Sequence, residues 1–182
     1  MSYEFEDTED FVVDDLFKKK NKKIDGKKKG NRTELDLVKV LNARFNTGFS
    51  RTVASGGRWG QMGSNQSLPK HAQDIFSGDL IVPQGFKFVI ESKGGYDDVD
   101  LSNIFLKGNN VIDSFLKQVT SDSKRCDRKP LLCWKKTRKP WLAFVLTKDL
   151  PENNFQYTLQ YRNWTAVALD ELLQLSDDFF LE

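Results

Sequence analysis

The sequence has few of the features that mark secreted or membrane proteins. Its 182 residues include two cysteines, Cys126 and Cys133, which are too few for a disulfide framework and lack a matching Cys or His pair for a zinc site. No apolar run is long enough to cross a bilayer. The acidic start, MSYEFEDTED, lacks the apolar core of a secretory signal. We therefore expect a cytoplasmic protein with no membrane partner and two reduced thiols.

Charge of either sign is plentiful, but it is unevenly distributed. The net charge is only +2, yet residues 1–15 are acidic and residues 18–32 read KKKNKKIDGKKKGNR. A second basic block covers residues 124–141, and the last residues are acidic again. Basic blocks beside glycines and aromatic residues favour a polyanionic partner such as nucleic acid. The alternative is a solubilising tail and a charged loop.

Hydrophobic periodicity predicts one α/β domain over residues 30–182, preceded by a flexible arm over residues 1–29, acidic and then basic. A polar, glycine-rich loop is expected over residues 54–77; loops of this length are usually functional or disordered. The predicted elements are a helix over 31–45 with Asn31 as its N-cap, strands over 49–53, 80–82 and 87–93, a helix over 110–125, strands over 130–134, 141–146, 155–161 and 165–169, and a helix over 170–175. This order predicts a mixed β-sheet flanked by helices.

Three charged residues stand at the ends of two apolar strands in GDLIVPQGFKFVIESKGGY, namely Asp79, Glu91 and Lys93. The PQG turn predicts an antiparallel hairpin, and side-chain alternation puts Glu91 and Lys93 on one face. Two neighbouring carboxylates repel unless a proton or cation lies between them, and carboxylate oxygens suit Mg²⁺ and Mn²⁺. Such a metal can activate water for phosphodiester hydrolysis. The alternatives are a surface ion-pair cluster and Asp74, instead of Asp79, as the ligand.

Asp79 followed by Glu91-Ser92-Lys93 resembles the catalytic signature of the PD-(D/E)xK nuclease superfamily, with Gly78 where that signature usually has proline. The segments GNRTELDLVKVL and SRTVASGG are most similar to archaeal and phage-type Holliday junction resolvases. The resemblance covers about residues 30–147. It implies a restriction-endonuclease-like α/β core and a metal-dependent DNA endonuclease that resolves four-way junctions or other branched DNA in recombination, as a homodimer because two symmetric strands are cut.

The resemblance also implies roles for single residues. Mg²⁺, for which Mn²⁺ can substitute, is expected on Asp79, Glu91, the Ser92 carbonyl and Glu34. Lys93 assists the attacking water, and Gln118 supports the site. For Glu34, a capping box with Asn31 is the alternative reading.

Other residues are candidates for contact with the DNA backbone or bases. They are Lys27, Lys28, Lys29, Arg32, Arg51, Ser55, Arg58 and Trp59. Trp59 could instead pack into the domain, and Ser55 could serve a turn. The single histidine, His71, is expected to be an exposed loop residue. A restriction-type or repair nuclease of the same fold, a non-catalytic DNA-binding module and an RNA nuclease remain alternatives.

Overall fold

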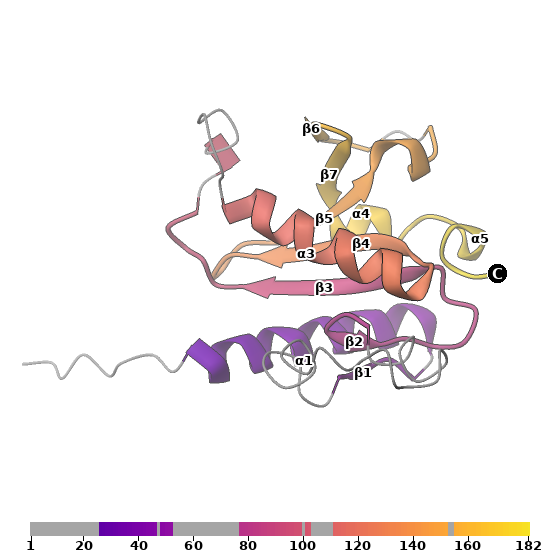
Figure 1. Cartoon of the computed structure of the whole chain (residues 1–182), viewed down its shortest axis with the longest axis horizontal. Coiled ribbons are helices and arrows are strands. Elements are labelled where there is room, and N and C mark those ends of the chain that lie inside the picture. The colour runs from indigo at the N-terminus through magenta and orange to yellow at the C-terminus, as the bar shows by residue number, and fades with distance from the viewer. Residues whose placement is uncertain (1–25, 47, 53–76, 100, 103–110, 153–154) are drawn as a thin grey trace, which may run out of the picture.

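A five-stranded mixed sheet, in the order β3-β4-β5-β7-β6, forms the centre of the computed structural model (Figure 1). The structure describes residues 26–46, 48–52, 77–99, 101–102, 111–152 and 155–182. Only β3 and β4 pair in parallel, and the other neighbours are antiparallel. The strands are β3 Phe88–Gly94, β4 Lys129–Lys135, β5 Trp141–Leu146, β6 Leu159–Tyr161 and β7 Trp164–Ala168.

Helices cover both faces of this sheet. In Figure 1, α3 lies on one side of β3 and α1 on the other. A separate two-stranded ribbon, β1 with β2, lies beside α1. The bounds are α1 Gly26–Phe45, β1 Ser50–Arg51, β2 Leu80–Ile81, α3 Val111–Cys126, η4 Thr147–Asp149, α4 Leu169–Leu172 and α5 Asp177–Phe180. The predicted class, a restriction-endonuclease-like α/β core with a mixed sheet between helices, is confirmed.

Strand alternation divides the core into two layers. Phe88 and Ile90 of β3 face the layer that contains Leu37 and Leu41 of α1, whereas Val89 faces the layer formed by α3. A β-strand buried on both faces reads as a continuous apolar run, which explains the pattern of FVI before Glu91. The two layers fix β3 firmly, so side chains at its carboxyl end have defined positions.

The predicted hairpin of strands 80–82 and 87–93 is wrong. β2 pairs with β1, through Ser50 with Ile81 and Arg51 with Leu80, while β3 pairs in parallel with β4. The long crossover that contains α3 makes the parallel pairing possible. One backbone hydrogen bond, from the Asp79 N–H to the Ile90 carbonyl at 2.9 Å, still joins the ribbon to β3.

Several predicted boundaries were also wrong. α1 begins at Gly26, so Asn31 lies inside the helix and cannot be its N-cap. The helix thereby includes residues that the sequence assigned to the arm. Strands predicted over 49–53 and 155–161 are shorter in the structure. Both cysteines are buried and neither is in a disulfide, and burial raises the pKa of Cys133 to about 12. In the described part of the chain, no helix is long and apolar enough to span a membrane.

Candidate active site

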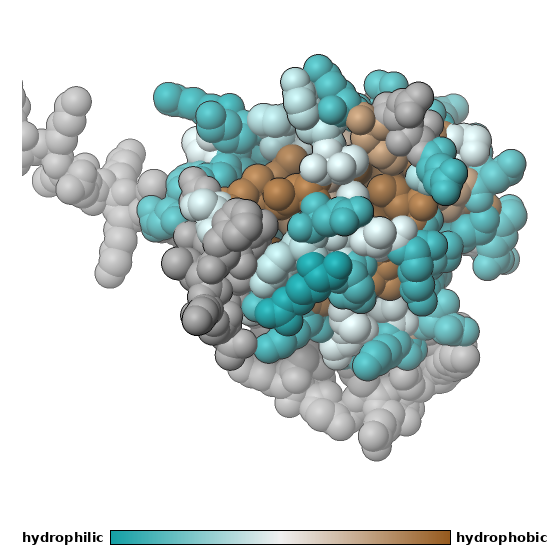
Figure 2. Space-filling view, turned by 90° about the horizontal axis from the view of Figure 1, so that it is seen from above, coloured by the Kyte–Doolittle hydropathy of each residue, from teal (hydrophilic) through white to brown (hydrophobic). Residues whose placement is uncertain are grey.

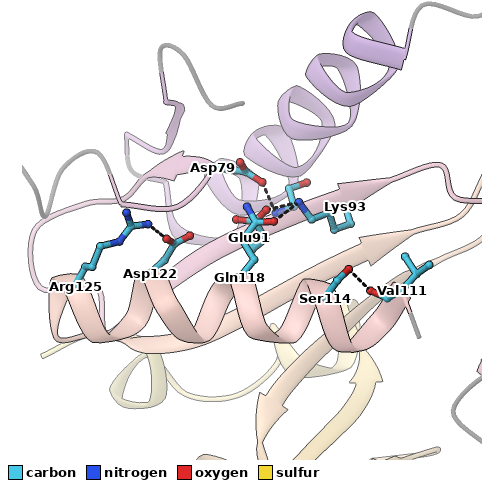
Figure 3. Close-up of polar contacts among 9 residues, drawn as sticks. Asp79, Glu91, Lys93, Val111, Ser114, Gln118, Asp122 and Arg125 are labelled. Atoms are coloured by element: carbon cyan, nitrogen blue, oxygen red, sulfur yellow. Dashed lines mark hydrogen bonds and ion pairs between the residues drawn. The ribbon is translucent and has the colours of Figure 1, made fainter. Parts of the chain in front are cut away.

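β3 presents Glu91 and Lys93 on the side of α3. Glu91 is fully buried, and its Oε1 forms an ion pair with Lys93 Nζ. Lys93 Nζ also donates a hydrogen bond to Gln118 Oε1 of α3 at 3.0 Å (Figure 3) and lies 5.5 Å from the centre of the Phe115 ring. Only 16% of the Lys93 side chain is exposed. Strand and helix therefore hold the ammonium group between a carboxylate, an amide oxygen and an aromatic face.

Asp79 reaches the same part of β3 from the ribbon. Its Oδ2 accepts a hydrogen bond from the Ser92 backbone N–H at 2.9 Å. Gly78, immediately before it, has φ of +78°, and a Cβ there would lie 2.7 Å from the Ile90 carbonyl oxygen. Proline cannot adopt a positive φ, and other residues would clash. The departure from the usual proline thus has a local structural reason, and it places Asp79 beside Glu91.

Electrostatics at this site favour the binding of a further positive charge. Burial raises the pKa of Glu91 to about 8, with a further rise from Asp79 and an opposing effect of Lys93. Burial alone would lower the pKa of Lys93, but Glu91, with a smaller contribution from Asp79, outweighs this and raises it. The metal-free site therefore retains protons to a higher pH than the separate groups would. Glu91 Oε2 is buried, and in the part of the chain that the structure describes no hydrogen-bond donor reaches it.

The oxygen atoms at this site suit a hard divalent cation. The N–H and C=O of one residue point to the same side of a strand, and the Ser92 N–H points to Asp79, so its carbonyl also lies away from β4. Together with Asp79 and Glu91 it forms an all-oxygen donor set, which Mg²⁺ and Mn²⁺ prefer. Within the described ranges, no three His, Cys, Asp or Glu side chains form a metal-binding group. The fit therefore rests on two carboxylates and a carbonyl.

The structure places Glu34 at the contact between α1 and the β1–β2 ribbon. It is buried on α1 and forms an ion pair with Arg51 Nε, while Arg51 Nη2 donates to Asn31 Oδ1 at 2.9 Å. The capping-box alternative is wrong, because Asn31 is inside the helix. Arg51 pairs with Leu80 across the ribbon, so the Glu34–Arg51 ion pair joins α1 to the ribbon that carries Asp79. This contact therefore links Glu34 to the ribbon that carries Asp79.

The expected DNA contacts are only partly described. Arg32 is exposed on α1, and Lys27, Lys28 and Lys29 lie in the first turns of that helix. Arg51 is engaged by Glu34. The remaining candidates lie outside the described residues: Ser55, Arg58, Trp59, His71 and Asp74.

Two aromatic residues beside Lys93 received no role from the sequence. Phe115 lies in the predicted helix over 110–125, and in the structure its ring faces the Lys93 ammonium group. Tyr96 is 47% exposed, has φ of 52°, and packs edge-on against Phe115 with ring centroids 4.8 Å apart. An exposed aromatic residue three positions after the lysine is the signal that could have drawn attention to it. One helical turn beyond Gln118, Asp122 forms an ion pair with Arg125 (Figure 3).

An acidic pair beside a lysine at the edge of a mixed sheet defines the class of PD-(D/E)xK nucleases. The chain belongs to the family described as "Phage putative PDDEXK endonuclease", whose model matches residues 25–179. It is also similar to "Protein D14" of Escherichia phage T5, with 26% identity over 130 residues, which are 69% of this chain and 74% of the relative. No solved structure matches the chain. The resemblance to the superfamily is thereby confirmed, and the family supports a nuclease.

Proposed function

We propose that the protein is a divalent-metal-dependent DNA endonuclease, with Mg²⁺ as the metal and Mn²⁺ as a substitute. Asp79, Glu91 and the Ser92 carbonyl hold the ion. The observation that carries the proposal is the buried Oε2 of Glu91, which meets no hydrogen-bond donor among the described residues and lies on the strand whose Ser92 N–H binds Asp79. When bound, the metal supplies Lewis-acid activation of a phosphate oxygen and of water.

Lys93 is proposed to orient the attacking water and to stabilise negative charge on the phosphate. Its raised pKa keeps the ammonium charged at neutral pH, so it acts as a hydrogen-bond donor and a positive charge rather than as a base. Gln118 fixes the ammonium through the 3.0 Å hydrogen bond. Glu34 completes the metal shell directly or through water, and its pairing with Arg51 positions the ribbon at the same time.

The proposed substrate is branched DNA, in particular the four-way junction, and the proposed assembly is a homodimer that cuts two symmetric strands in recombination. Support comes from the resemblance of residues 30–57 to junction resolvases. Lys27, Lys28, Lys29 and Arg32 on α1, with Arg51, Ser55, Arg58 and Trp59, are the proposed DNA contacts. A duplex-specific restriction-type or repair nuclease is the second candidate, since the same metal site serves any phosphodiester.

A cleavage assay with Mg²⁺ on four-way junction, flap, single-stranded and linear duplex substrates tests both proposals. We expect cutting of the junction in preference to linear duplex, and its loss in EDTA. Asp79→Asn and Lys93→Ala should each reduce the rate about a thousandfold, since several kcal/mol of transition-state stabilisation are removed.

Glu152→Gln serves as the matched control, because Glu152 is exposed and far along the chain from the site. Equal cutting of linear duplex would favour the second candidate. If Asp79→Asn has full activity, or if no substrate is cut while DNA binding persists in EDTA, the protein is a non-catalytic DNA-binding module and the proposal is wrong.

A further inference from the structure

A hollow lies on the α3 side of the sheet, over the two strands next to the one that carries Lys93. It has a volume of about 230 Å³ and is lined by Leu101, Trp134, Lys136, Lys139, Pro140 and Leu142. We call it the β4–β5 hollow. Its lining combines an apolar interior with two lysines, and none of these residues takes part in the proposed metal site. Seen from above, on the side of α3, the surface carries apolar areas bordered by hydrophilic side chains (Figure 2).

Strand register connects this hollow to the active site. Lys93 of β3 pairs with Trp134 of β4, and Trp134 pairs with Leu142 of β5, so the three residues form one row across the sheet. All three face α3, because Lys93 contacts Gln118 while Trp134 and Leu142 belong to the α3 layer. At about 4.8 Å per strand, the backbone beneath the hollow lies roughly 10 Å from that of Lys93. A nucleotide flanking the cleaved bond can reach this distance.

The chemistry of the hollow fits a nucleobase with its phosphate. Leu101, Pro140 and Leu142 offer apolar surface for the flat faces of a base. The indole N–H of Trp134 is buried and meets no acceptor among the described residues, and an indole can only donate, so an edge oxygen or nitrogen of a base would satisfy it. A purely apolar ligand would leave the cationic rim of Lys136 and Lys139 unused. A nucleotide fits both features of the hollow, because its flat base packs against the apolar lining and its phosphate pairs with the two lysines.

The turn that carries the rim lysines is held in place. Asp97 accepts hydrogen bonds from the Thr137 N–H and hydroxyl, each at 2.8 Å, and thereby ties residues 136–139 to the segment that follows β3. Lys135 lies over the Trp141 ring at 5.4 Å, which fixes the start of this turn. The rim therefore keeps a defined distance from Lys93 and does not depend on binding to form.

We propose that the β4–β5 hollow receives an unpaired nucleobase next to the cleaved bond. The inference rests on the proposed nuclease function and narrows its substrate to DNA with an unstacked base near the cut. Taking a base out of a duplex costs a few kcal/mol, and the cost is least where the base is already unpaired, so such a hollow selects bulges and branch points over regular duplex.

Binding in EDTA tests the hollow without cleavage. Fluorescence anisotropy compares a labelled duplex that contains one unpaired nucleotide with the same duplex fully paired. We expect the full-length protein to bind the bulged duplex at least tenfold more tightly. Leu142→Phe, which fills the hollow, should abolish this preference. Leu146→Phe is the matched control, because it is the same change on the same strand and layer but does not line the hollow.

A second pair of variants guards against misfolding of Leu142→Phe, which circular dichroism would reveal. Replacing both Lys136 and Lys139 by alanine should weaken binding of the bulged duplex at least tenfold, whereas Lys148→Ala, at another exposed lysine, should not. Equal binding of both duplexes by the unaltered protein, a preference that survives Leu142→Phe, or undiminished binding of the bulged duplex by the double lysine variant overturns the inference. Cleavage with Mg²⁺ is scored separately, so a protein that binds as expected but does not cut refutes the nuclease proposal alone.

Discussion

Replacing Glu91 by glutamine should change how the stability of the metal-free protein depends on pH. The pKa of Glu91 rises from 4.5 to about 8 in the folded state, chiefly because of burial. A carboxyl group with a raised folded-state pKa holds its proton more tightly in the folded protein. Its contribution to stability is therefore complete below pH 4.5 and is lost as the pH rises through about 8. At 1.36 kcal/mol per pKa unit, this loss between pH 5 and pH 8 is about 3 kcal/mol.

Glutamine does not titrate, so Glu91→Gln should lack this loss. Urea unfolding in EDTA at pH 5, 6, 7 and 8, followed by tryptophan fluorescence, measures the free energy of unfolding of both proteins. We expect the variant to gain about 3 kcal/mol relative to the unaltered protein from pH 5 to pH 8. The slope is diagnostic, because the lost contact with Lys93 adds an offset of its own. Glu152→Gln, at an exposed position, should show no such change.

Two outcomes would refute the reasoning. A difference between the two proteins that stays constant from pH 5 to pH 8 would mean that Glu91 is ionised throughout and needs no cation. Magnesium gives the second test, since a ligand at one hundred times its Kd stabilises the folded state by about 2.7 kcal/mol. At pH 8 we expect this gain for the unaltered protein and its loss in Glu91→Gln. Equal stabilisation of both proteins would place the metal elsewhere.

Three further changes have defined expected outcomes. Gly94→Ala should destabilise the protein by about 1–3 kcal/mol in thermal or urea unfolding, because a Cβ there would overlap an α1 side chain. Gly30→Ala is its control: Gly30 lies inside α1 with open space around it, so alanine there should stabilise the protein by about 0.5–1 kcal/mol. Gly78→Ala should lower Mg²⁺ affinity in calorimetry, since its positive φ and the nearby Ile90 carbonyl resist a side chain; unchanged affinity would contradict this. Gln118→Ala should slow cleavage about tenfold with little change in DNA affinity, because only the Lys93 ammonium loses a partner.

The sequence predicted well those elements whose pattern depends on local burial. α3 has an apolar stripe through Ile112, Phe115 and Val119 at helical spacing, and these residues are buried in the structure. β4 and β5 are apolar runs bounded by a basic turn, and both were placed within a residue of their ends. Burial on one or two faces leaves a periodicity in the sequence, and these elements needed no further information.

Strand pairing could not be read in the same way. The short sequence LIV at residues 80–82 is compatible with any open edge, and the neighbouring PQG turn suggested the nearest partner in the chain. β2 pairs with β1 and β3 pairs with β4, and both partners are distant in sequence. The β-strand propensity of a segment does not indicate which distant segment it pairs with. Asp79 and Glu91 were expected to meet, and they lie close together. The contacts that bring them together are the hydrogen bonds from the Asp79 N–H to the Ile90 carbonyl and from the Ser92 N–H to Asp79 Oδ2, not the ladder of a hairpin.

The pairing of Glu34 with Arg51 was equally hidden. A helix start at residue 31 left a capping box as the alternative for Glu34, whereas a start at Gly26 makes it an interior position facing the ribbon. Lysine-rich first turns carry no apolar stripe, so the true beginning of α1 left no periodic signal. The sequence thus predicted which residues form the candidate site, and their proposed roles stay predictions, whereas the contacts of Glu34 and Arg51 around the site required the structure.

The two carboxylates are supported by different parts of the molecule. Glu91 belongs to a central strand packed on both faces, while Asp79 immediately precedes β2 of the two-stranded ribbon, which packs on the core through Leu80. A substitution that shifts the ribbon would move the proposed metal ligand Asp79 and leave the five-stranded sheet folded. Relatives of this protein can therefore keep the fold and lose the proposed nuclease activity. A shared fold alone does not show that a relative is a nuclease.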